Sequence, residues 1–247
     1  MKSLSIDRLL FKLGSIGAFS LVWILGSIGS GRAVGSRPEA KVDFSPPNAE
    51  APASTTGGAS RGWGTCIEPD DNLVALMPPS NLGLTLEAHP TIWLYVPESS
   101  ADTLELVLNR EDGTEVLRKT TVMPQESGII SLTLNESDLP ALEIGKDYRW
   151  YASILCSETD RSGNAIVEGW VKRIDDSTLR DKLARAEVEN HLQLYAEAGI
   201  WYETLATLVH LRRTQPDNAE VLSSWEQLMQ SVGLEAIADA PLSQLPR

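Results

Sequence analysis

Glu168 is the acidic residue whose surroundings suggest chemistry most directly. It stands in a strand-like run, two residues before Trp170. Arg149 and Arg161 lie in neighbouring segments, and either could form an ion pair with it. A glycoside hydrolase would need a second carboxylate facing Glu168 across a cleft, and the sequence pattern identifies none. We therefore interpret Glu168 as half of a salt bridge on a sheet face, and we treat Arg149, Glu168 and Trp170 as a candidate ligand surface.

The three histidines do not indicate a hydrolase of the Ser-His-Asp type. Such an enzyme needs a nucleophile on a strained turn and a base within hydrogen-bond reach of it. His89 precedes Pro90 at the entrance of a strand, where a hydrogen bond within a turn is the favoured role. His191 and His210 belong to a helical region, and we assign them to a helix surface or to packing between helices. We predict no catalytic, cofactor-binding or metal-ligating residue.

The N-terminus has the pattern of an export signal. Lys2, Arg8 and Lys12 are followed by the uncharged, largely apolar run 13–28. Gly31 and Ala33 would suit a peptidase that requires small residues, so we place the end of the signal at residue 33. The alternative is an uncleaved anchor, since about 16 apolar residues approach the lower limit for spanning a bilayer. Either way, the rest of the chain is expected outside the cytoplasm, in the periplasm or extracellular space.

The two cysteines are expected to pair. Cys66 and Cys156 are 90 residues apart in a chain with an export signal, and oxidising compartments favour disulfides. A metal site would have to take its other ligands from the histidines, none of which has metal-site spacing. We therefore predict a disulfide between Cys66 and Cys156.

The chain is strongly acidic. Its formal net charge is −13, and removal of residues 1–33 leaves 17 basic and 33 acidic residues, a net charge of −16. Such a surface repels nucleic acid and anionic lipid, so we exclude a nucleic-acid partner. Contact with a membrane is expected only through an uncleaved signal.

The seven tryptophans allow a second interpretation. Trp93, Trp150 and Trp170 fall in predicted strands, and an exposed aromatic pair on such a face can stack on sugar rings. Large aromatic residues at strand positions more often fill the core, and we favour that role. The same argument assigns Trp201 and Trp225 to packing within the helical region.

Residues 34–61 are predicted to form a disordered linker, because Pro, Gly, Ala, Ser and Thr dominate them.

A β domain follows over residues 62–175. The run 91–96 is apolar on both faces, as a central strand would be, and 104–109 and 115–123 form a hairpin around Asp112-Gly113. Strands are also expected over 130–134, 148–156 and 165–174. Six or seven short antiparallel strands predict one β-sandwich.

Leu142, Gly145 and Tyr148 have the spacing L-x-x-G-x-x-Y immediately before an alternating strand. This spacing resembles the tyrosine corner of immunoglobulin-like and fibronectin-like sandwiches, in which the tyrosine hydroxyl bonds to backbone upstream. We therefore predict an immunoglobulin-like or fibronectin-like fold for the β domain.

A helical cap is predicted over 176–239, followed by a tail at 240–247. Asp175-Asp176-Ser177 supplies helix-start residues, and apolar residues then recur at helical spacing through four helices. The cap is expected to pack on itself or on the sandwich. One set of residues in this region has the spacing of a tetratricopeptide hairpin, which it resembles: Leu192, Tyr195, Gly199, Trp201 and Pro216. It departs from that pattern at Thr204 and Leu211, which stand where small alanines are expected.

Seven segments of the chain together have a recognisable pattern: 81–85, 89–97, 128–132, 148–151, 160–163, 167–171 and 195–202. They resemble those of the cyanobacterial exported proteins grouped as domain of unknown function 928. The resemblance covers roughly residues 62–240. It implies export and the paired cysteines, and it implies no activity.

We expect an exported, non-catalytic interaction or structural module of the cell envelope, without a cofactor. Its partner would be an unidentified protein or glycan of the envelope. The alternative is a carbohydrate-binding protein or a carbohydrate-active hydrolase, so the sequence leaves the question of enzymatic activity open.

Overall fold

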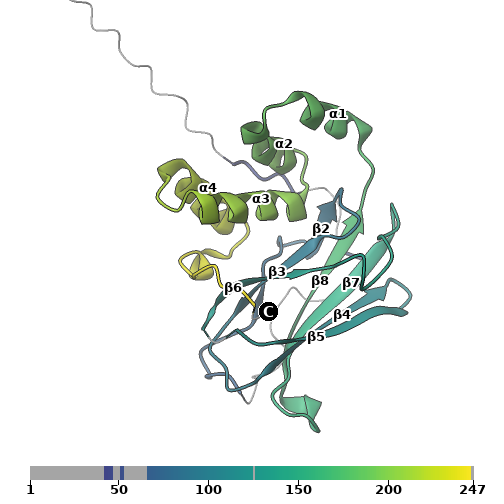
Figure 1. Ribbon diagram of the computed structural model, residues 1–247, viewed down its shortest axis with the longest axis vertical. Helices are drawn as coiled ribbons and strands as arrows, with labels where there is room; N and C mark the ends of the chain where they lie inside the picture. Colours follow the sequence, from purple (N-terminus) through teal and green to yellow (C-terminus); the bar gives the residue numbers. More distant parts are fainter. Residues whose placement is uncertain (1–41, 47–50, 53–65, 125, 246–247) are drawn as a thin grey trace, which may run out of the picture. The chain divides into compact units, whose positions relative to one another are not determined.

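The computed structural model describes residues 42–46, 51–52, 66–124 and 126–245 of the chain. In this part, two β-sheets of three and five strands are followed by four helices (Figure 1). The predicted signal or anchor at residues 1–33 lies outside the described residues. Among the helices that are described, none has the length and apolar character needed to cross a membrane.

The three-stranded sheet has the order β1-β3-β6. Its strands are β1 (Val74–Ala75), β3 (Thr91–Val96) and β6 (Gly128–Thr133). Both pairings are antiparallel, and β3 is the central strand. The run of β-branched and aromatic residues at 91–96 predicted this position correctly, because a central strand is covered on both faces.

The five-stranded sheet has the order β2-β8-β7-β4-β5. Its antiparallel part consists of β4 (Thr103–Arg110), β5 (Glu115–Val122), β7 (Asp147–Ile154) and β8 (Ala165–Arg173). The edge strand β2 (Leu82–Thr85) pairs with β8 in parallel. This corrects the expectation of a wholly antiparallel sandwich. β2 is distant from β8 in sequence and is not joined to it by a hairpin, so no turn signal could reveal the pairing.

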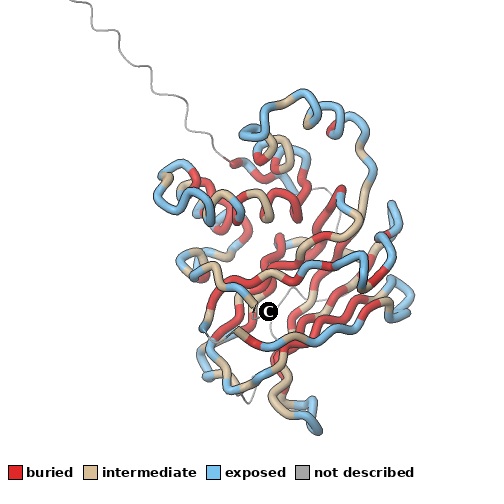
Figure 2. The backbone as a smooth tube through the Cα atoms, in the orientation of Figure 1, coloured by how far each residue is buried: buried red, intermediate tan, exposed pale blue. Residues whose placement is uncertain are grey.

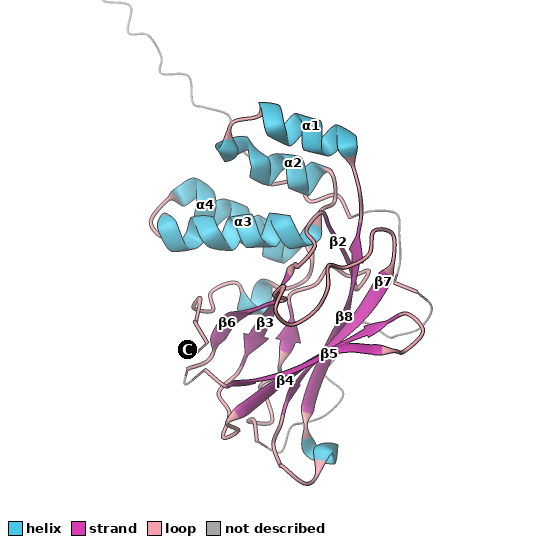
Figure 3. Ribbon diagram, turned by 45° about the vertical axis from the view of Figure 1, so that its right-hand side comes forward, coloured by secondary structure: helices cyan, strands magenta, loops and turns pink. Residues whose placement is uncertain are grey.

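The helices are α1 (Ser177–Arg185), α2 (His191–Glu197), α3 (Trp201–Thr214) and α4 (Ala219–Ser231). They lie close together and α3 is next to β2, as Figure 3 shows. Short 3-10 turns cover Arg161–Gly163, Val188–Asn190 and Glu235–Ile237. As predicted, an aspartate begins the first helix: Asp176 accepts a hydrogen bond from the backbone N–H of Leu179 at 2.9 Å.

Most buried apolar residues of the sheets and helices belong to one core, seen in Figure 2 as buried stretches in the strands and in α3. A smaller cluster joins Leu84, Leu179 and Ile200. Trp150 of β7 and Trp201 of α3 are both fully buried. The Trp150 indole N–H donates to the Tyr202 hydroxyl at 2.9 Å, and that hydroxyl donates to the Trp170 carbonyl at 3.2 Å. The helical region therefore packs on the β part, which was one of the two arrangements expected.

Part of the predicted linker is packed against the helices. Within 34–61, Val42 and Phe44 are buried, and the backbone N–H of Ser45 donates to the Ala196 carbonyl at 3.2 Å. The disordered state predicted for this stretch is therefore wrong at residues 42–46. The prediction rested on the low apolar content of the whole segment. It did not consider that Val42 and Phe44 are two positions apart, so that both can point to the same surface in an extended chain. Most other residues of the linker lie outside the described part.

The predicted disulfide is confirmed. It joins Cys66 and Cys156, whose Cα atoms are 5.2 Å apart. Cys66 comes directly before Ile67, which pairs with Ser99, and Cys156 follows the end of β7. The bond thus fastens the start of the β part to the centre of the five-stranded sheet. A disulfide of this kind indicates an oxidising compartment.

Candidate functional site

One face of the five-stranded sheet carries polar side chains. Residues alternate along β7, so that Tyr148 and Trp150 are buried while Arg149 and Tyr151 are partly exposed. The register between β7 and β8 pairs three residues of each strand on the side of the sheet to which Arg149 and Tyr151 point. We call this set the polar sheet face, and its members are Asp147, Arg149, Tyr151, Glu168, Trp170 and Lys172.

Arg149 is at the centre of this face. Its Nη2 atom donates to both carboxylate oxygens of Glu168, at 2.7 Å each. The guanidinium also lies over the Tyr151 ring at 5.0 Å and the Trp170 ring at 5.5 Å, within the range of a cation–π interaction. The three residues of the predicted ligand surface are therefore neighbours. Of the two arginines considered as partners for Glu168, Arg149 fills that role, while Arg161 pairs with Glu105 at 2.7 Å.

The accessibility of these groups differs. The side chains of Arg149 and Glu168 are 23% and 19% exposed. Trp170 is only 4% exposed, and the guanidinium of Arg149 stands over it. A ligand could therefore meet the ion pair directly, but it could stack on the Trp170 ring only if Arg149 moved. Tyr151 is the partly exposed aromatic residue of this face.

A second ion pair extends the face toward one end of β7. Lys172 and Asp147 are 2.9 Å apart. With Arg149 and Glu168, these residues make two cations and two anions, so the face is electrically neutral although the chain carries a net charge of −13. Long-range attraction therefore contributes little at this face, and recognition there depends on hydrogen bonds and packing.

Four polar atoms on this part of the sheet are buried without a hydrogen-bond partner among the residues that the structure describes. Asn109, Arg149 and Trp170 are in register across β4, β7 and β8, and Asp147 stands two residues before Arg149. The atoms are Asn109 Oδ1, Asp147 Oδ1, Arg149 Nε and Trp170 Nε1. Such unpaired groups are uncommon in native proteins. This line across the sheet thus retains both donor and acceptor capacity.

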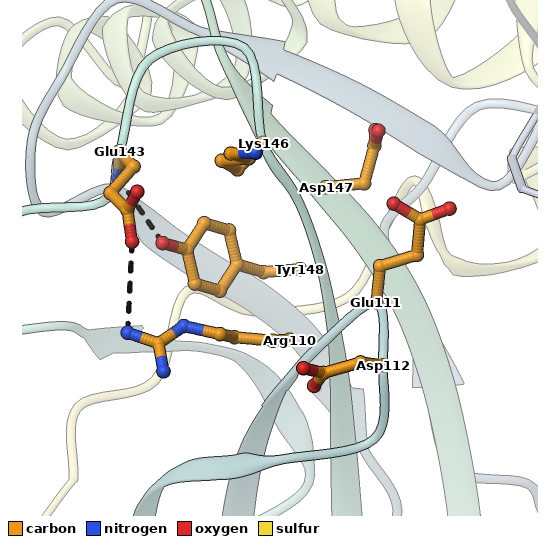
Figure 4. Close-up of a pocket in the computed structure, with 7 residues that line it drawn as sticks. All are labelled: Arg110, Glu111, Asp112, Glu143, Lys146, Asp147 and Tyr148. Carbon is orange, nitrogen blue, oxygen red and sulfur yellow. Dashed lines mark hydrogen bonds and ion pairs between the residues drawn. The ribbon is translucent and has the colours of Figure 1, made fainter.

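A pocket of about 580 Å³ adjoins the face at the end of the β4–β5 hairpin. Asp147 belongs to both. The turn after β4 and the loop before β7 form the pocket, and Gly113 and Gly145 adopt φ values of 87° and 78° in those two turns. Its lining residues, shown in Figure 4, are Arg110, Glu111, Asp112, Glu143, Lys146, Asp147 and Tyr148.

Glu143 organises one wall of this pocket. Its backbone N–H donates to the Tyr148 hydroxyl at 3.2 Å, and its carboxylate lies 3.6 Å from Arg110 (Figure 4). The tyrosine hydroxyl thus bonds to backbone upstream, as the L-x-x-G-x-x-Y spacing predicted. Opposite, the backbone N–H of Thr114 donates to Asp112 and lowers the pKa of that carboxyl. The pocket is therefore lined by ionised groups of both signs, an arrangement suited to polar contacts.

Two buried carboxyl groups that belong neither to the set named above nor to the pocket lining also have shifted pKa values. Glu203, at the start of α3, accepts from the Thr85 hydroxyl at 2.6 Å and from the backbone N–H of Leu86 at 2.9 Å. Burial raises its pKa despite these bonds. Glu105 is held by Arg161 and Arg118, and the hydrogen bond from Arg161 lowers its pKa. Both carboxyls join elements of the fold to each other.

The histidines occupy structural positions. The Nε2 atom of His89 is 3.1 Å from the Leu139 carbonyl, and that of His191 is 3.1 Å from the Leu183 carbonyl. His210 is exposed on α3. Within the described part of the chain, no three His, Cys, Asp or Glu side chains are grouped closely enough to hold a metal ion.

Several members of the site were not identified from the sequence. Alternation along β7 and β8 could have revealed Asp147 and Lys172, whereas the pocket depends on two turns that only the fold brings together. Gly58-Ala59-Ser60-Arg61-Gly62 has the G-x-S-x-G spacing of a hydrolase nucleophile turn. This run lies outside the described residues, in a stretch without the strand-then-helix pattern that the hydrolase motif requires.

Comparison with known proteins places the chain in a family without indicating an activity. A family model described as Domain of Unknown Function (DUF928) matches residues 56–242. No curated protein matches the sequence. Among solved structures, a Bacteroides uniformis beta-glucuronidase is similar over 40% of this chain, with 14% identity and a TM-score of 0.25. The match spans 12% of that enzyme's chain, and a likeness this distant carries no argument.

Proposed function

This chain belongs to the DUF928 family, and we propose that it is an exported, non-catalytic binding module of the cell envelope. The observation that carries the proposal is the arrangement of Arg149 on the polar sheet face, held by Glu168 and placed over two aromatic rings. The ligand would be a protein or glycan of the envelope, bound at this face and the adjoining pocket.

The chemistry of the Arg149 arrangement favours binding. Arginine, tyrosine and tryptophan are the residues that most often dominate the energy of protein interfaces. Because both Glu168 oxygens already hold the guanidinium, little side-chain freedom is left to lose when a partner binds. The same bonds engage Glu168 in an ion pair.

Two finer features of the fold belong to the same proposal. The bond between Glu143 N–H and the Tyr148 hydroxyl supports an immunoglobulin-like or fibronectin-like β part. Gly199, with φ of 69° between α2 and α3, supports a tetratricopeptide-like hairpin. Such folds serve many functions, so the argument for binding rests on the site.

Export and a cyanobacterial source are proposals as well. The charged residues and apolar run at the N-terminus have the pattern of a signal or anchor, and the disulfide supports an oxidising compartment. Residues 34–41 would separate the folded part from that segment.

The test is affinity capture from envelope extracts with three versions of the exported protein. The double variant Arg149→Ala/Glu168→Ala removes the ion pair without leaving one charge unpaired. The matched control, Lys119→Ala/Asp138→Ala, removes the 2.6 Å ion pair that links β5 to the loop after β6. We expect wild type and control to retain the same protein or glycan, and the Arg149 variant to lose it. Equal capture by all three would refute the proposed surface.

A second assay distinguishes the binding module from the alternative, a carbohydrate-active hydrolase. Isolated envelope glycans incubated with the protein would gain reducing ends, which can be counted by a colorimetric assay. We expect the count to stay constant while binding persists.

A further inference from the structure

Residues 42–46 form a short strap across the helices, drawn as the first purple segment of Figure 1. Its side chains alternate between the protein and solvent. Val42 and Phe44 are 7% and 6% exposed, while Asp43 and Ser45 between and after them are exposed. The strap therefore lies as an extended peptide with two apolar side chains turned inward.

The strap is seated by one aromatic contact and one backbone hydrogen bond. The Phe44 ring meets the ring of the fully buried Trp201 edge-on, with centroids 5.0 Å apart. The backbone N–H of Ser45 donates to the carbonyl of Ala196, in the last turn of α2. The same carbonyl also accepts from the backbone N–H of Gly199 at 3.1 Å. A carbonyl oxygen has two lone pairs, so it can hold the helix end and the strap together.

The surface that receives the strap continues beyond it. Next to Val42 is a cavity of about 130 Å³ between α2, α3 and α4. Leu192 and Val221 give it apolar walls, while Gln193 and Ser224 bring polar groups to its edge. The groove thus offers more room than the strap fills, with further hydrogen-bonding groups at its rim.

The strap occupies this groove as an internal ligand. Nineteen residues lie between Pro46 and Cys66, so the strap is tethered to the domain by a long connection. Tethering of this kind gives an effective concentration of the order of millimolar, which allows a small contact to persist. A contact of two side chains and one hydrogen bond can also be displaced.

We propose that the groove between α2, α3 and α4 is a peptide-binding site that the strap keeps closed. The partner would be an extended segment of another protein, with an aliphatic and an aromatic residue two positions apart, as Val42 and Phe44 are. The strap itself shows which side chains the groove accepts. This groove shares no residue with the polar sheet face. The two proposals are therefore tested independently.

The test supplies the strap in trans. The probe is a fluorescein-labelled synthetic peptide with the sequence of residues 38–48, and binding to the full-length protein is followed by fluorescence anisotropy. In the Phe44→Ala protein the strap should leave the groove, so we expect the probe to bind at least ten-fold more tightly than to wild type. Asp43→Ala changes an exposed strap residue and should behave as wild type. A probe that itself carries Phe44→Ala should not bind.

Two results would overturn the proposal. One is a folded Phe44→Ala protein, judged by its circular dichroism, that binds the probe no better than wild type. The other is a wild-type dimer in light scattering whose subunits exchange straps, because the groove would then serve assembly of identical chains.

If Phe44→Ala fails to fold, hydrogen exchange of the wild-type protein decides the matter. Saturating probe should expose the Ser45 amide to exchange while the amides of α3 remain protected. An unchanged Ser45 amide would count against a displaceable strap.

Discussion

The indole N–H of Trp150 donates to the hydroxyl of Tyr202 across the boundary between the five-stranded sheet and α3, at 2.9 Å. Two glycines make this contact possible. A Cβ atom at Gly83 would lie 2.5 Å from the Tyr202 ring, and one at Gly169 would collide with the Trp150 indole. The union of sheet and helices therefore depends on two positions where a side chain is excluded.

Tyr202→Phe should destabilise the protein by about 1–3 kcal/mol, because the buried Trp150 N–H and the Trp170 carbonyl would each lose a partner. The measurement is a chemical-denaturant melt. Tyr151→Phe, which removes a partly exposed hydroxyl of the same sheet, is the control and should change the midpoint little. Equal midpoints for wild type and Tyr202→Phe would show that these bonds do not hold the sheet and helix together.

Tyr148→Phe should cost about 0.5–1.5 kcal/mol, since the Glu143 N–H would lose the hydroxyl that accepts from it. The cost should appear as a lower denaturation midpoint with an unchanged slope. An unchanged midpoint would mean that water replaces the hydroxyl without loss, and the tyrosine-corner interpretation would lose its main support.

Glu203 should contribute more to the free energy of unfolding in acid than at neutral pH. Burial raises the pKa of Glu203 above its ordinary value of 4.5. A group whose pKa is raised in the folded state stabilises the folded protein fully at pH values below its unfolded-state pKa. That stabilisation is lost as the pH rises through the folded-state pKa. Relative to Glu203→Gln, wild type should therefore lose stability as the pH rises from about 4. Melts of both proteins from pH 4 to 8 measure the difference.

Glu105 provides the control of opposite sign. The hydrogen bond from Arg161 lowers the pKa of Glu105, so its contribution is present above the unfolded pKa and is lost as the pH falls through the folded value. Glu105→Gln should therefore approach wild type in acid and fall below it at neutral pH. The two variants should show opposite trends, and parallel trends would contradict the assignment of either group.

Breaking the disulfide should cost up to about 4–5 kcal/mol in the chain-entropy treatment of a loop of this length. Non-reducing mass spectrometry should identify a peptide pair linked through Cys66 and Cys156, and melts with and without reductant give the cost. The double variant Cys66→Ser/Cys156→Ser should match the reduced protein and should not respond to reductant. A reductant effect in that variant would point to a different target.

The strands and helices with a local signal could be predicted. β3 follows from a run that is apolar on both faces, β7 and β8 from alternation, and α1 from the aspartate that begins it. β2 could not be predicted, because its partner β8 lies about 80 residues further along the chain and the two strands share no turn. Local patterns describe neighbours in sequence, whereas a parallel pairing depends on the whole path of the chain.

The candidate site shows the same division. Proximity of Arg149, Glu168 and Trp170 could be inferred because β7 and β8 adjoin each other. The partner of Arg161 could not, since a 3-10 turn directs that side chain to Glu105 on β4. Val42 and Phe44 were hidden for a different reason: composition averages a whole segment, and two well-placed side chains are enough to bind it.

The position of the disulfide determines how the domain would bear force. A pull on the chain before Cys66, opposed at the C-terminus, passes through the sulfur atoms directly to Cys156. Residues 67–155, which include β1 to β7, therefore lie outside the line of tension and cannot be unravelled from that end while the bond is intact. The load would fall instead on the strap at one end, on the C-terminal residues that bond to Ile129 at the other, and on β8 and the helices between them.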